Sequence, residues 1–176
     1  MEDHRRSGLT LVELLVTLTL LAILVGLAAP AMAVFVDRAR LRSATQALAQ
    51  ELRQARDHAI SHRKTVYFSI SARTDRWCYG WRDDAPCRCD SPAPSAQCRS
   101  AEDGPLQTQS VTDFPGVQLL ASRRAATRGV RFSPIRGTAT GATFRLRSRH
   151  GEARVILSPL GRVRVCSPSD GAAAPC

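Results

Sequence analysis

Arginine is the residue type whose number and spacing in this chain point most directly to chemistry. The 25 basic residues include a single lysine, Lys64, and face 15 acidic residues, for a formal net charge of +10. Downstream of Phe114, eleven arginines accompany only two carboxylates. A guanidinium stays charged at every relevant pH and donates paired hydrogen bonds to phosphate oxygens. The composition favours a partner rich in phosphate. The alternatives are a solvated basic face, or one that meets acidic lipid or neighbouring subunits.

The arginines in this last third of the chain alternate with other residues. Arg145, Arg147 and Arg149 form one set, and Arg162 and Arg164 form a second. Residues two apart on a strand project from the same face. Such a row suits the phosphates of a nucleic-acid backbone and predicts binding with little sequence preference. Aromatic residues are scarce in this region, so base stacking is not the expected mode.

Cysteine is the second residue type with a telling pattern. An even number, confined to the part after the apolar N-terminus, predicts disulfides in an oxidising compartment, which for a bacterium is the periplasm. We expect Cys166 and Cys176 to pair across a short C-terminal loop. The other four follow the spacing C-x8-C-x-C-x8-C, which leaves their pairing open; zinc is a weaker alternative because no C-x-x-C pair occurs. The six are Cys78, Cys87, Cys89, Cys98, Cys166 and Cys176.

No pattern in the chain indicates catalysis. His58 and His62 stand four apart, which could place two metal ligands on one helix face. No glutamate follows His58 and no third ligand is evident, so surface side chains are the favoured interpretation. A nucleophile elbow and a phosphate-binding glycine loop are both missing. The sequence therefore predicts no enzyme, no catalytic residue, no metal and no cofactor.

The N-terminus supplies the element that would anchor these residues. Residues 1–8 are polar, and residues 9–36 form an apolar run longer than the roughly 20 residues that span a bilayer. Arg5 and Arg6 precede the run, so the C-terminal side is expected outside the cytoplasm. This predicts a single-pass inner-membrane protein with a periplasmic domain. Glu13 within the run would cost about 2.5–3.5 kcal/mol at the bilayer centre, and so it needs a partner.

Beyond the membrane segment the periodicity predicts one helix followed by strands. Apolar residues recur at steps of three or four through residues 37–62, which indicates an amphipathic continuation of the helix. Residues 63–176 then alternate in short runs that predict an antiparallel, twisted sheet, interrupted by a cysteine-rich insertion at 83–104. The fold class is α+β. The expected strands are 65–70, 77–81, 117–120, 130–133, 142–147, 153–157 and 162–166.

The stretch Gly8-Leu9-Thr10-Leu11-Val12-Glu13 resembles the leader-peptidase site of type IV pilins and type II secretion pseudopilins. The resemblance implies that a prepilin peptidase removes residues 1–8 after Gly8 and that the new N-terminus at Leu9 is methylated. It also implies that the ammonium of one subunit neutralises Glu13 of another, so that this carboxylate sets the register of assembly. A secretory signal cleaved before Val34 and an ordinary anchor are the alternatives.

The C-terminal half resembles the FimT/GspH type of minor pilin, in residues 130–134 and 155–165. The FimT branch is associated with DNA uptake through a Gly-Arg-any-Arg motif, which is Gly161-Arg162-Val163-Arg164 here. The resemblance implies a minor pilin that joins major and minor pilins in a filament and binds extracellular double-stranded DNA for natural transformation. A GspH-like pseudopilin with a purely structural role in type II secretion is the alternative. The predicted DNA-binding residues are Gly161, Arg162, Arg164, Arg145, Arg147, Arg149 and Arg154.

Processing of the N-terminus is the first testable prediction. Mass spectrometry of the mature protein should find a methylated N-terminus at Leu9, and Gly8→Ala should leave a larger, unprocessed precursor. Glu13→Val should still be processed but should assemble poorly, because the buried ammonium loses its partner. A mature chain that starts at Val34 would show that the secretory-signal alternative is right.

Overall fold

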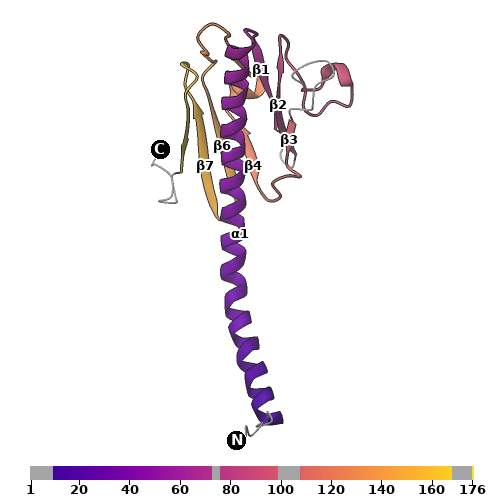
Figure 1. Cartoon of the computed structure of the whole chain (residues 1–176), viewed down its shortest axis with the longest axis vertical. Coiled ribbons are helices and arrows are strands. Elements are labelled where there is room, and N and C mark those ends of the chain that lie inside the picture. The colour runs from indigo at the N-terminus through magenta and orange to yellow at the C-terminus, as the bar shows by residue number, and fades with distance from the viewer. Residues whose placement is uncertain (1–9, 73–75, 99–107, 168–175) are drawn as a thin grey trace, which may run out of the picture. The chain divides into compact units, whose positions relative to one another are not determined.

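The computed structural model describes residues 10–72, 76–98, 108–167 and 176 of the chain (Figure 1). The chain divides into two compact units, Met1–Val36 and Asp37–Cys176. The first element, helix α1 (Leu11–Ser61), contributes residues to both units. Gly8 and Leu9, the predicted cleavage and methylation positions, lie outside the described residues.

The first unit is helical from Leu11 onward, and most of its described side chains are exposed. Thr10 begins the helix, because its side-chain oxygen accepts a hydrogen bond from the backbone N–H of Glu13 at 3.3 Å. Thr17 and Thr19 turn their hydroxyls back onto helix carbonyls, which satisfies these polar groups within the helix. Over the part of the chain that is described, no helix combines the length and apolarity that crossing a membrane requires. The spanning role of residues 9–36 stays a prediction.

The second unit is built around one face of α1. The predicted apolar stripe is buried, and Leu48, Leu52, Ala55 and Ala59 have no exposed surface. Thr45 is buried on the same face and donates its hydroxyl to the carbonyl of Leu41 at 2.7 Å. Burying each leucine stabilises the fold by about 2 kcal/mol, whereas the alanines mainly allow the strands to approach closely.

Eight strands form two antiparallel four-stranded sheets, which confirms the α+β class and divides the expected sheet in two. The first sheet has the order β3-β2-β1-β5, with strands β1 (Val66–Ala72), β2 (Trp77–Asp83), β3 (Thr108–Ser110) and β5 (Val130–Phe132). The second has the order β4-β6-β7-β8, with strands β4 (Gln118–Ala121), β6 (Ala142–Ser148), β7 (Gly151–Leu157) and β8 (Val163–Cys166). A short helix α2 (Arg123–Arg128) and a 3-10 turn (Pro94–Ala96) complete the described elements.

Both sheets share one core with α1. Figure 1 shows the helix running along the two sheets of the second unit, with β6 and β7 on one side and β1 and β2 on the other. Phe68 of the first sheet and Phe144 of the second are fully buried, and their ring centroids are 6.5 Å apart. The helix stripe and the inner faces of both sheets therefore exclude water together, as one hydrophobic cluster.

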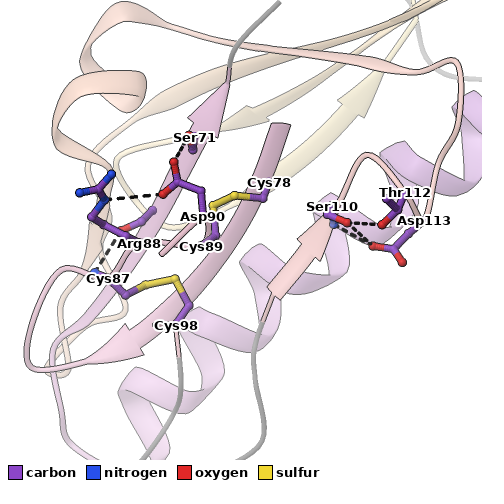
Figure 2. Close-up of a disulfide and its surroundings, with 11 residues drawn as sticks. Ser71, Cys78, Cys87, Arg88, Cys89, Asp90, Cys98, Ser110, Thr112 and Asp113 are labelled. Carbon is purple, nitrogen blue, oxygen red and sulfur yellow. Dashed lines mark hydrogen bonds and ion pairs between the residues drawn. A yellow bond between two sulfur atoms is a disulfide. The ribbon is translucent and has the colours of Figure 1, made fainter. Parts of the chain in front are cut away.

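Two interleaved disulfides hold the insertion against the first sheet. Cys78 pairs with Cys89, and Cys87 pairs with Cys98, so the two bridges cross in sequence (Figure 2). The backbone N–H of Cys87 also donates to the hydroxyl of Ser69 on β1 at 3.3 Å. The prediction that these cysteines form disulfides is confirmed, and the structure supplies the pairing that the spacing left open.

His58 differs from the expected surface side chain. Its Nε2 lies 2.9 Å from Oδ1 of Asp83 at the end of β2, and both side chains are largely buried. The ring of His62 stacks on that of His58, with centroids 3.9 Å apart. His58 and His62 therefore close the end of the core between α1 and β2. The four-residue spacing alone did not indicate this arrangement.

Asp37 ties the beginning of the second unit to the turn between β6 and β7. Its Oδ2 accepts hydrogen bonds from the hydroxyl of Ser148 at 2.7 Å and from the backbone N–H of His150 at 3.0 Å. The His150 ring nitrogen Nδ1 is 3.2 Å from the same oxygen. Partial burial raises the pKa of Asp37, but the hydrogen bonds from Ser148 and His150 and the charge of His150 lower it more, so the net pKa is lowered.

Removing this carboxylate should destabilise the domain in a pH-dependent way. Because the folded pKa of Asp37 lies below its ordinary value, its stabilisation is present above about pH 4 and is lost as the pH falls through the folded pKa. Urea unfolding of residues 37–176 should show Asp37→Ala to cost about 1 kcal/mol at pH 7 and much less near pH 2 to 3. The control Asp57→Ala removes an exposed carboxylate 4.0 Å from Arg56 and should change stability little. An equal loss at both pH values would contradict the assignment.

Candidate nucleic-acid interface

The outer face of the second sheet carries most of the predicted arginines. Along β6 the burial alternates, with Phe144 and Leu146 facing the core and Arg145 and Arg147 exposed on the other side. The same alternation along β7 buries Val155 on the inner face. The predicted projection of Arg145 and Arg147 from one face follows directly from this period of two.

The strand register brings arginines from three strands together. Arg145 of β6 is directly opposite Arg154 of β7. On the next strand, Arg154 is opposite Cys166 and Ile156 is opposite Arg164, which makes Arg154 and Arg164 diagonal neighbours on one face. We call Arg145, Arg147, Arg154 and Arg164 the arginine row.

Arg149 and Arg162 lie at opposite ends of the sheet, beyond the row. Strand β6 ends at Ser148, so Arg149 is exposed in the turn, and the expectation that it continues the strand alternation is wrong. The turn follows from the Asp37 contacts to Ser148 and His150. Arg162 precedes β8 at the other end of β7, whose seven residues extend about 20 Å. One compact patch of all six arginines does not form.

One carboxylate interrupts the row. Glu152 on β7 is opposite Arg147, and its Oε1 accepts a hydrogen bond from Nε of Arg154 at 3.1 Å. The Arg154 side chain is 37% exposed, so this pair remains in contact with solvent. Arg154 is therefore the member of the row whose charge is already partly compensated.

Gly161 forms the turn in the loop before β8. It is buried, with a φ of 77°, and its N–H donates to the carbonyl of Ser158 at 2.9 Å to close the turn. A Cβ at this position would lie 2.1 Å from the carbonyl oxygen of Gly137. The structure thus assigns Gly161 to the turn that positions Arg162. Arg162 is also joined to Ser158 by two hydrogen bonds.

Arg56 is a contributor that the sequence analysis missed. Its Nε donates to the carbonyl of Gly137 at 3.1 Å, and the added Cβ of Gly161 would approach the same nitrogen at 2.7 Å. Arg56 follows Leu52 by four residues and so lies at the edge of the buried stripe, but this spacing does not indicate its contact with Gly137. Its guanidinium fastens the loops of Gly137 and Gly161 to α1.

The third disulfide lies beside the row. Cys166 ends β8 and pairs with Cys176, as expected from the sequence. Cys166 is buried although it faces outward with Arg154, the residue opposite it in the register. The bridge ties residue 176 to the strand that carries Arg164.

Comparison with known proteins identifies the class. Residues 44–161 match the family described as Type II transport protein GspH, and residues 3–29 match the prokaryotic N-terminal methylation motif. The chain belongs to the GspH family. No curated protein matches it significantly.

Solved structures of a minor pseudopilin share the fold. Two structures of the minor pseudopilin EpsH from the type II secretion system of Vibrio cholerae align with TM-scores of 0.54 and 0.51 at 15% identity, over 77% and 74% of this chain and 99% of each of theirs. The type IV minor pilin FimU of Pseudomonas aeruginosa aligns at 22% identity with a TM-score of 0.49, over 77% of this chain and 95% of its own.

Together the family, the methylation motif and the fold define a minor pilin or pseudopilin. The methylation motif implies processing by a prepilin peptidase and partners within a pilin or pseudopilin filament. The N-terminal helix is that of a pilin or pseudopilin filament component, and its membrane anchoring stays a prediction.

The role of Gly161 can be tested with a matched glycine. Gly161→Ala should destabilise the domain by about 3 kcal/mol or more, because the methyl group meets the Gly137 carbonyl and Arg56 in addition to the strain of a positive φ. Gly116 has a φ of 84° and nothing within 4 Å of an added Cβ, so Gly116→Ala should cost only the backbone strain, about 1 kcal/mol. Urea denaturation of both variants measures the difference. Equal losses would mean that the close approach at Gly161 is unimportant.

Proposed function

We propose that this protein is a FimT-like minor pilin, anchored in the bacterial inner membrane through residues 9–36, which binds extracellular double-stranded DNA for uptake in natural transformation. The observation that carries the proposal is the arginine row on the exposed outer face of the second sheet. The Gly-Arg-any-Arg motif at Gly161–Arg164 supports the same conclusion by resemblance.

Repulsion within the row is the physical argument for an anionic partner. Arg145 and Arg154 are directly opposite in the register, and like charges at such positions destabilise a sheet. Glu152 compensates one of these guanidiniums but not both. A polyanion along the row relieves the remaining repulsion and releases its own counterions, so binding and the fold reinforce each other.

The row favours contact with the DNA backbone over base recognition. Its side chains are guanidiniums, which donate paired hydrogen bonds to phosphate oxygens. The phenylalanines of this region, Phe132 and Phe144, are fully buried and cannot stack on bases. Binding is therefore expected to be weak, strongly dependent on salt and nearly independent of sequence.

A structural pseudopilin is the second candidate. The family description and the two EpsH structures name type II secretion, and a subunit of that machinery needs no nucleic-acid contact. The two candidates differ in one measurable property, because only the first requires the outer face of the second sheet to bind a polyanion.

DNA binding by residues 37–176 tests the proposal. Every buried hydrophobic residue of the described chain lies at or after Leu41, so this segment contains the whole core. Replacing Arg162 and Arg164 with glutamine should weaken binding to a random-sequence duplex. It should also reduce the slope of log K against log salt by about one unit for each lost phosphate contact. Fluorescence anisotropy between 20 and 200 mM salt measures both effects.

The control replaces two arginines on the other side of the sheet. Arg42 and Arg53 are exposed on α1, which packs against the inner face, so Arg42→Gln with Arg53→Gln should leave binding nearly unchanged. Arg56 is unsuitable as a control because it bonds to Gly137. Equal weakening by both pairs would show that the charge acts diffusely. No binding by the unmodified domain at low salt would favour the structural pseudopilin.

A further inference from the structure

One end of the domain exposes aliphatic side chains that are not packed in the core. Ile135, between β5 and β6, is 86% exposed, and Leu160, between β7 and β8, is 75% exposed. Ile60, in the last turn of α1, is 40% exposed. Exposed apolar side chains that cluster, unlike scattered ones, mark interaction sites.

Hydrogen bonds join the three segments that carry these side chains. The N–H of Ala139 donates to the carbonyl of Pro159 at 2.9 Å, which joins the two loops. Arg56 joins them to the end of α1, and the Cβ added at Gly137 would lie 2.6 Å from Cδ1 of Ile60. The loops are therefore held by the scaffold and present their aliphatic side chains in a fixed arrangement.

The surface is hollowed between the helix end and the first loop. A cavity of about 490 Å³ is lined by Ile60, Arg63, Pro134 and Ile135. It is large enough to take a bulky side chain, and three of its four lining residues are apolar. A rigid apolar notch of this kind is the usual seat of an anchor residue in a protein interface.

The rim of the notch is positively charged. Arg63 lines it, and Arg136 and Arg162 are exposed on the two joined loops. Residues 133–141 and 158–162, which form the two loops, contain no carboxylate. Charge complementarity therefore selects a partner surface that has carboxylates around an apolar centre.

We propose that this loop patch (Ile60, Pro134, Ile135 and Leu160, rimmed by Arg63, Arg136 and Arg162) docks a neighbouring filament subunit. The subunit inserts an aliphatic or aromatic side chain into the notch and places carboxylates against the arginines. The inference rests on the assembly role of the protein. The patch contains no member of the arginine row and shares only Arg162 with the predicted DNA-binding residues.

A protein partner fits the patch better than DNA or lipid does. A DNA backbone offers phosphates but no apolar surface against which Ile135 and Leu160 could be buried. A bilayer surface accepts exposed aliphatic side chains and arginines, but it presents no shaped side chain that would fill a rigid notch. Burying aliphatic side chains and filling the cavity both require a partner with a shaped apolar surface.

Photocross-linking of the full-length chain in its own bacterium tests the proposal. The photoreactive residue p-benzoylphenylalanine is placed at position 135, and at position 124 on exposed α2 as the control. Position 135 should form an adduct with another subunit that carries a methylated pilin N-terminus, at least tenfold above the control. Arg63→Glu with Arg136→Glu should reduce that adduct at least fivefold through charge repulsion.

Other outcomes would overturn the inference. These are adducts only with lipid or DNA, equal adducts at both positions, or an adduct that withstands the charge reversal. Absence of an adduct from a chain that is normally processed and membrane-associated would also overturn it, while leaving the family assignment intact. Replacing both Ile135 and Leu160 with asparagine should abolish docking. The measurement is loss of the adduct formed by a cross-linker at position 136. The same variant should keep its DNA affinity within twofold of the unmodified protein. Failure of DNA binding alone would therefore not affect this proposal.

Discussion

The close contact between α1 and both sheets is the constraint on which the second unit depends. Small residues such as Ala55 and Ala59 on the buried stripe let the strands approach the helix, and Leu48 and Leu52 fill the space between. Two side chains of α1 also hold the two ends of the second sheet. Asp37 holds the β6–β7 turn, and Arg56, about 28 Å further along the helix, holds the loops at the opposite end.

This double attachment explains how the second sheet carries a row of like charges. The repulsion between Arg145 and Arg154 amounts to about 1 kcal/mol or less, whereas each buried side chain on the inner face contributes more than that. The inner face therefore sets the register, and the outer face is free to carry charge. The arginine row lies on the outer face of the sheet and the loop patch at the end of the domain, so the row and the patch share no residue.

The sequence predicts the parts of the fold that are periodic and long. The 3.6-residue period located α1, and the alternation of apolar residues located β6, β7 and β8 to within two residues. Strand β3 reads Thr-Gln-Ser and has no apolar residue, and α2 buries only Ala125, so neither leaves a readable pattern.

The sequence predicted which residues belong to the candidate site but not how they are arranged in space. The alternation showed that Arg145 and Arg147 share a face, yet the cross-strand pairing of Arg145 with Arg154 depends on register, which tertiary packing decides. The contact of Arg56 with Gly137 spans 81 residues, and no local pattern encodes it.

The crossed disulfides have a consequence for the oxidative folding of the chain. The alternative partners of the same cysteines, Cys78 with Cys87 and Cys89 with Cys98, are nine residues apart, whereas the native partners are eleven apart. Loop-closure entropy in an unfolded chain therefore favours the uncrossed pairs, by about 0.2 kcal/mol for each bridge. Random oxidation of the unfolded chain would therefore form the uncrossed isomer about twice as often as the native one. Native pairing becomes preferred only after β1 and β2 have aligned Cys78 and brought Ser69 to Cys87. We therefore expect catalysed thiol–disulfide exchange to raise the yield of native pairing above that of oxidation alone.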